Sequence, residues 1–107
     1  MIILDLEWNR GYDKKPLNEI LQIGAVRTEK LGGPIVDTFN ACLRPTVHKK
    51  FDLGAKKLPE LEVFKTSRQR FPGAAEAFRA WCGDDKVFAG WGGGDVEALN
   101  ENCKYWG

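Results

Sequence analysis

The sequence predicts an α/β domain with a mixed sheet and flanking helices. Three apolar segments, at residues 1–9, 19–28 and 35–43, follow one another through short connections, which is typical of an antiparallel meander. A helix, a short fourth strand at 86–91 and a last helix from Asp95 then alternate. Because a strand–helix–strand crossover returns the chain to the sheet, we expect the fourth strand to lie parallel to the first.

Composition is that of one ordinary domain spanning 1–107, with 43% hydrophobic and 29% charged residues. No apolar run approaches the ~20 residues that span a bilayer, and the N-terminus shows no secretory signal pattern. The three cysteines form no Cys-x-x-Cys pair, so we interpret them as reduced, buried side chains. These features predict a cytoplasmic protein without a membrane segment.

Local signals justify the remaining elements. The segment 19–28 is apolar on both faces, which predicts a strand covered on both sides. Pro72 suits the first turn of a helix and Gly83 its end. Only a short helix, at 51–58, is expected between the third strand and this helix, and the glycines at 92–94 allow a sharp turn into the last one. The apolar stripe of the last helix consists of Val96, Leu99, Cys103 and Trp106.

The first strand carries two acids among apolar residues. Side chains alternate along a strand, so Asp5 and Glu7 point to one side while Leu4 and Leu6 point to the other. Two neighbouring carboxylates repel each other, and burying either of them is costly. A divalent cation such as Mg²⁺ or Mn²⁺ removes both costs. The pattern therefore predicts a metal-binding pair or, as the alternative, the solvated face of an edge strand.

A third acid, Asp95, follows the fourth strand behind the glycine-rich bend. Ligands of open α/β sheets gather at the carboxyl ends of strands, so we expect Asp95 close to Asp5 and Glu7. A helix N-cap is the alternative role for an aspartate at this position. The bend has neither the Gly-Lys-Ser/Thr of a P-loop nor the spacing of a dinucleotide fingerprint.

Basic residues concentrate at 44–70. This segment contains eight Lys and Arg residues but only three acids, although the net charge of the whole chain is +1. Such a segment is either a phosphate-binding surface or a solvated face without a partner. The single histidine, His48, is interpreted as a surface residue with no assigned role. The lysines that we consider candidates for substrate contact are Lys49, Lys50, Lys56 and Lys57.

Three motifs together resemble a known nuclease superfamily. They are Leu4-Asp5-Leu6-Glu7-Trp8-Asn9, the strand Asn-Glu-Ile-Leu-Gln-Ile-Gly-Ala-Val at 18–26, and Trp91-Gly92-Gly93-Gly94-Asp95. In this order they resemble the DEDD (DnaQ-like) 3′–5′ exonucleases, and within them the Eri1/KapD-type branch. The resemblance implies a ribonuclease H-like fold.

Site roles follow from this resemblance. It implies that Asp5 bridges two cations, that Glu7 holds the cation which activates the attacking water, and that Asp95 holds the second cation or its hydration shell. Two such Mg²⁺ or Mn²⁺ ions stabilise the attacking and leaving oxygens of phosphodiester hydrolysis. Trp8 and Asn9 would meet the terminal nucleotide, and the basic segment would follow single-stranded or 3′-overhanging RNA or DNA.

The third motif of the superfamily, a His or Tyr base followed by a fourth acid, has no counterpart after Asp95. We therefore expect an incomplete exonuclease-like domain without the C-terminal part of the fold, weakly active or inactive alone. An exposed edge on the fourth strand and bare apolar surface would favour self-association. The alternatives are a non-catalytic nucleic-acid-binding relative and a nucleotide-binding α/β domain.

Overall fold

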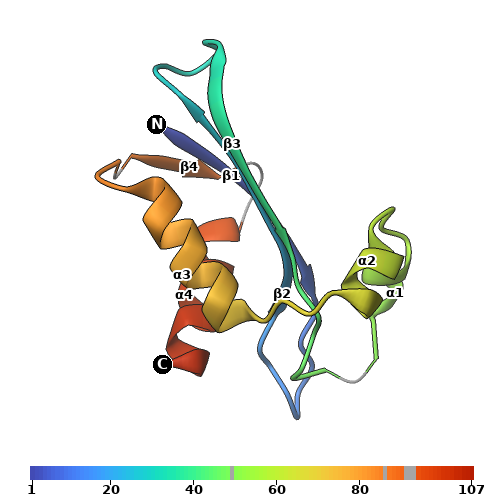
Figure 1. Ribbon diagram of the computed structural model, residues 1–107. Coiled ribbons are helices and arrows are strands. Elements are labelled where there is room, and N and C mark those ends of the chain that lie inside the picture. The colour runs from blue at the N-terminus through green and yellow to red at the C-terminus, as the bar shows by residue number, and fades with distance from the viewer. Residues whose placement is uncertain (49, 86, 91–93) are drawn as a thin grey trace.

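A four-stranded mixed sheet forms the centre of the molecule (Figure 1). The computed structural model describes residues 1–48, 50–85, 87–90 and 94–107. The strands are β1 (Ile2–Asn9), β2 (Glu19–Thr28), β3 (Ile35–Cys42) and β4 (Phe88–Gly90). Their order is β3-β2-β1-β4, with β2 antiparallel to both β1 and β3, and β4 parallel to β1. The predicted mixed sheet and the parallel return of the fourth strand are confirmed.

In the described residues, the helices that flank the sheet are α1 (Leu53–Lys56), α2 (Leu61–Thr66), α3 (Phe71–Cys82) and α4 (Asp95–Trp106). The long helices α3 and α4 lie on one side, while α1 and α2 lie on the other, at one end of the sheet (Figure 1). Sequence patterning missed α2, because Phe64 is the one buried side chain of this helix and a single anchor produces no periodicity. Within the described parts of the chain, no helix has the length and apolarity to cross a membrane.

Alternation along β1 separates a core face from an acidic face. Ile2, Leu4 and Leu6 are buried against α3, together with Phe71 and Phe78. The intervening side chains of β1 point to the opposite face, where α1 and α2 cover a smaller cluster. That cluster is formed by Leu21, Ala55 and Phe64. The core therefore anchors one face of β1 and leaves the acidic face open beyond the two short helices.

Arg27 fastens the end of α3 to the sheet. Its guanidinium lies 4.3 Å from the ring centroid of Trp81 and donates to the backbone carbonyls of Trp81 and Cys82. It also pairs with Asp37 at 3.5 Å and with Asp85 at 3.8 Å. A cation at a helix C-terminus stabilises the unpaired carbonyls there, so this contact fixes the position of the crossover helix before the chain enters β4.

The residues that helix α4 buries differ from the apolar stripe that the sequence shows. Its buried residues are Asp95, Ala98 and Asn102. Of the predicted stripe, Leu99 is half-buried, and the other three members, Val96, Cys103 and Trp106, are exposed. The stripe thus contributes Leu99 to the core, while the buried positions of the helix are held by Ala98 and two polar residues.

An amide docks this helix. Asn102 is 0% exposed, and its Oδ1 accepts the Ile20 backbone N–H at 3.2 Å while its Nδ2 donates to the Asn18 carbonyl at 2.7 Å. The Nδ2 group also donates to the Ala98 carbonyl one turn earlier at 2.8 Å. The bond to Ile20 is buried, so the side chain of Asn102 supplies the partner that this backbone N–H at the start of β2 needs.

Replacing Asn102 by Ala should destabilise the fold by about 2–4 kcal/mol, because two backbone groups would lose their partner inside the protein. Urea unfolding followed by circular dichroism measures this difference. The matched control is Asn100→Ala, since Asn100 is an exposed asparagine on the same helix. An equal decrease in the free energy of unfolding in the two variants would contradict the docking role of Asn102.

Candidate functional site

The two acids of β1 lie on its open face, as the alternation predicted. Asp5 is exposed and Glu7 is half-buried. Their partners on β2 are Gly24 and Gln22. A Cβ atom on Gly24 would lie 3.0 Å from the Asp5 carbonyl oxygen, so a side chain there would press against β1. The glycine therefore allows β2 to approach the strand that carries both acids.

Glu7 is the acid whose pKa is raised by burial and by the neighbouring carboxylates. Burial raises the pKa of the Glu7 carboxyl above its usual range. Negative charge on other acids raises this pKa further; in decreasing order of effect they are Asp5, Glu60 and Asp95. Four carboxylates thus share one region of negative potential around the carboxyl end of β1.

Glu60 is a member of this group that sequence reasoning missed. It is the N-cap residue of α2, and its side chain makes no capping hydrogen bond. Its negative charge also raises the pKa of the Cys42 thiol, after the larger effect of burial. In the sequence it stands with Glu62 within the basic segment 44–70, where the surrounding lysines and arginines mask the pair.

Asp95 reaches the same end of the sheet through α4. It is the first residue of this helix and is 5% exposed. Gly94 before it has φ of 89°, which favours glycine, and a Cβ atom there would lie 3.7 Å from the Trp8 ring. The start of α4 therefore lies against the last residues of β1, as the crossover predicted. The remainder of the glycine-rich motif, Trp91–Gly93, lies outside the described residues.

The acids do not form a preformed metal centre. In the described ranges of the chain, no three His, Cys, Asp or Glu side chains are close enough together to hold a metal ion. The donor chemistry of Asp5 and Glu7 suits Mg²⁺ or Mn²⁺, because both are hard oxygen ligands on one face of a strand. A third carboxylate would have to move closer to complete the ligand set.

The residues that follow the acids serve the fold directly. Trp8 is half-buried and packs against the core. Asn9 is 1% exposed, donates through Nδ2 to the Lys50 carbonyl at 2.9 Å and accepts the Asp52 N–H at 2.8 Å. Asn9 therefore ties the end of β1 to the loop at 50–52, and in this conformation its amide faces the chain. Its contact with a nucleotide stays a prediction.

A cleft of about 560 Å³ opens beside Glu7 and Trp8, with α1 as its other wall. Asp52 shapes this cleft: its carboxylate accepts the backbone N–H groups of Arg10 and Ala55. Burial acts to raise the pKa of Asp52, but these hydrogen bonds outweigh it and hold the pKa below its usual range. The carboxylate thus stays charged at neutral pH and clamps α1 against the end of β1.

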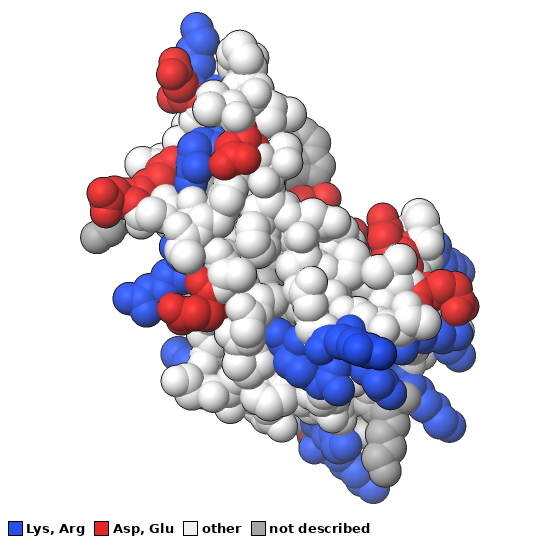
Figure 2. All heavy atoms as spheres, in the orientation of Figure 1, with Lys and Arg blue, Asp and Glu red and all other residues white. Residues whose placement is uncertain are grey.

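The basic segment lies at the same end of the molecule. Lys and Arg side chains gather around α1, α2 and the loops below them (Figure 2). Of the candidate substrate contacts, Lys50, Lys56 and Lys57 are exposed, and Lys49 lies outside the described residues. Because the Lys50 carbonyl is bonded to Asn9, the segment begins directly at the carboxyl end of β1.

His48 is buried, so its assignment to the surface was wrong. It is 5% exposed, and its Nε2 lies 2.6 Å from the Leu17 carbonyl. The reason is Glu19, a buried carboxylate that accepts the backbone N–H groups of residues 46–48 at 2.7–2.9 Å. These bonds pull the loop inward although lysines follow it. The one sequence signal for this anchor is an acid at the first position of an otherwise apolar strand.

The cysteines are free, but not all are buried as predicted. Cys82 is buried, Cys42 is half-buried and Cys103 is exposed.

No protein-family model, curated protein or solved structure matches the chain. The resemblance to exonucleases therefore rests on the motifs themselves.

Replacing Glu7 by Gln should raise the melting temperature slightly in metal-free buffer at pH 7. A carboxyl whose pKa is higher in the folded than in the unfolded chain destabilises the fold once it ionises. The gain should shrink as the pH falls and vanish near about pH 3, below the pKa of a glutamate in the unfolded chain, because Glu7 is then protonated in both states. Calorimetry across this pH range measures it, with Glu29→Gln, an exposed acid, as the control. A lower melting temperature for Glu7→Gln would contradict the repulsion.

Proposed function

We propose that this chain is a metal-dependent 3′–5′ exonuclease domain of ribonuclease H-like type. The observation that carries the proposal is the gathering of acids around Glu7, beside a cleft and at the basic end of the molecule. The strand order β3-β2-β1-β4, with a parallel last strand, supports the same fold type.

The electrostatics favour a divalent cation. Asp5 and Glu7 would hold it from one face of β1, and Asp95 would complete the ligand set from the start of α4. When bound, such ions supply an activated water and stabilise the oxygens of the displaced phosphate. A cation would also remove the repulsion that now raises the pKa of Glu7, so the folded chain itself would be stabilised by metal.

The surroundings suit a nucleic-acid end. The cleft beside Glu7 has an aromatic wall at Trp8, which can stack on a base. Lys50, Lys56 and Lys57 are exposed and can neutralise backbone phosphates. The proposed substrate is therefore a single-stranded or 3′-overhanging RNA or DNA, entering with its 3′ end toward the acids.

One observation favours a second candidate, a nucleic-acid-binding module that does not cut. Across the described residues, no group of three possible ligands is assembled. A chain that binds phosphates through its basic segment but holds metal through two acids would bind an oligonucleotide and hydrolyse it slowly or not at all. The nuclease assay below separates the two candidates.

Mn²⁺ should raise the melting temperature of the wild-type chain by roughly 10 °C when its concentration is about 100 times the dissociation constant. Asp5→Asn should remove this increase, since it deletes a ligand and leaves the core face of β1 unchanged. The control variant is Asp13→Asn, an exposed acid in the loop after β1. Differential scanning fluorimetry measures the shift. A melting temperature indifferent to millimolar Mn²⁺ would rule out the metal site.

A 5′-labelled single-stranded oligonucleotide should shorten stepwise from its 3′ end in the presence of Mn²⁺, and not with a chelator. Asp5→Asn should slow this at least ~100-fold, because even outer-shell partners of a metal ligand account for about 10–100-fold. Gel electrophoresis reads the products, and fluorescence anisotropy reads binding. Binding of the oligonucleotide without shortening would select the binding module. If the oligonucleotide is neither bound nor shortened, both candidates are overturned.

A further inference from the structure

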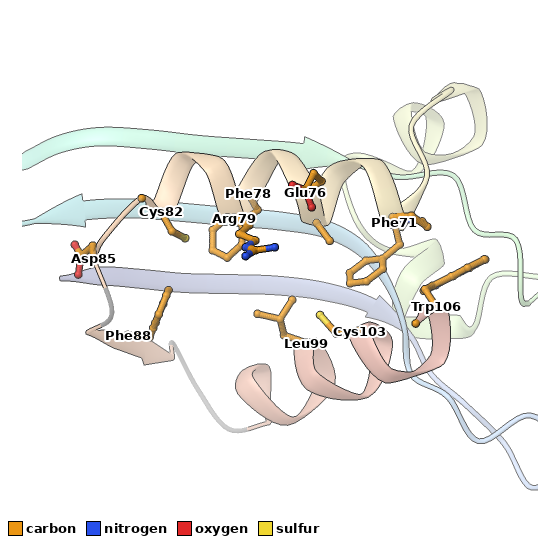
Figure 3. A pocket seen from close by; sticks show the side chains of 14 residues that line it. Phe71, Glu76, Phe78, Arg79, Cys82, Asp85, Phe88, Leu99, Cys103 and Trp106 are labelled. Atoms are coloured by element: carbon orange, nitrogen blue, oxygen red, sulfur yellow. The ribbon is translucent and has the colours of Figure 1, made fainter.

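An open apolar groove of about 580 Å³ lies between α3 and α4. Figure 3 shows Phe71, Leu99 and Cys103 pointing into the space between the two helices, with Phe88 of β4 at one end and Trp106 at the other. The groove lies on the core side of the sheet, whereas Asp5 and Glu7 project from the opposite face. It is therefore separate from the candidate active site.

Large hydrophobic side chains surround this groove on the outside. Phe88 is 43% exposed and Trp106 is 37% exposed. On α4, Val96 and Tyr105 are exposed as well. An open apolar groove with large exposed hydrophobic side chains at both of its ends marks an interaction site.

In the described part of the sheet, the outer edge of β4 belongs to the same surface. β4 is the outermost strand of the sheet next to β1. The Val87 carbonyl accepts the Ile2 N–H, so alternation turns the backbone groups of Phe88 and Gly90 outward. A free edge next to an apolar groove favours the addition of another chain.

We propose that the groove between α3 and α4 is the interface for a second copy of this chain, in a two-fold symmetric dimer. The same helix supplies both a wall of the groove and the projecting aromatics Tyr105 and Trp106, so each copy can offer the group that the other receives. The rim carries Glu76 and Arg79, and a two-fold axis can set Glu76 against the partner's Arg79. The net charge of +1 imposes little repulsion between copies.

The alternative edge, β3, fits a second copy less well. Ile35 and Val36 are exposed there, but the pairing of β2 with β3 shifts register between Arg27 and Thr28, opposite this end of the strand. Such a bulge disturbs the regular spacing that strand addition needs. Ile35 therefore provides a matched control position, an exposed apolar side chain on the opposite edge.

Sedimentation velocity across a wide range of protein concentration should show a monomer–dimer equilibrium. Trp106→Glu should raise the dimer dissociation constant about 30-fold or more, because truncating a central aromatic typically costs at least about 2 kcal/mol of binding free energy. Ile35→Glu, which adds the same charge on the other edge, should change it less than about threefold. A monomer at every concentration, or a dimer lost in Ile35→Glu and kept in Trp106→Glu, would overturn the proposal.

The native cysteines give a second readout that needs no variant. Cys103 lines the groove, whereas Cys42 is half-buried on β3 and serves as an internal reference. Burial raises the pKa of both thiols, so alkylation should be carried out at mildly alkaline pH. Mass spectrometry should find that labelling of Cys103 slows relative to Cys42 as protein concentration rises. A labelling ratio of Cys103 to Cys42 that stays constant while sedimentation shows dimers forming would place the dimer interface elsewhere and overturn the proposal.

Discussion

Buried polar side chains hold the end of the sheet where the acids gather. Asn9 and Glu19 are partners in the register of β1 and β2, and both are almost fully buried. Asn9 binds the loop at 50–52, Glu19 binds the backbone of 46–48, and Asn102 joins the start of β2 to α4. Because each side chain holds two or more backbone groups in partly or fully buried hydrogen bonds, loss of one would unsettle its neighbours as well.

These buried polar contacts help to explain how the folded chain tolerates acids that repel one another. The pKa of Glu7 is raised by burial and by neighbouring charge, so its ionised form opposes folding at neutral pH. The core face of β1, with Leu4 and Leu6, and the clamp around Asp52 hold the strand in place against that repulsion. A local arrangement that costs stability persists when its surroundings over-determine it, which is common where side chains serve binding or chemistry.

Sequence reasoning succeeded where one physical rule dominates. Alternation placed Asp5 and Glu7 on one face of β1, and the strand–helix–strand crossover predicted that β4 runs parallel to β1. It failed where polar side chains take buried positions: Glu19 buries the loop that carries His48, and Asn102 is the fully buried residue of α4, although it lies outside the apolar stripe of that helix. Such contacts join residues far apart in the chain, so no local pattern announces them.

The helix α4 links the two surfaces of the molecule. Its first residue, Asp95, lies at the acidic end of β1, while its later turns, with Cys103 and Trp106, form a wall of the apolar groove. Asn102 fixes the helix between these regions through hydrogen bonds to the start of β2. A partner seated in the groove would therefore act on a rigid element that carries the third acid, while the open face of β1 stays accessible to a cation and to nucleic acid.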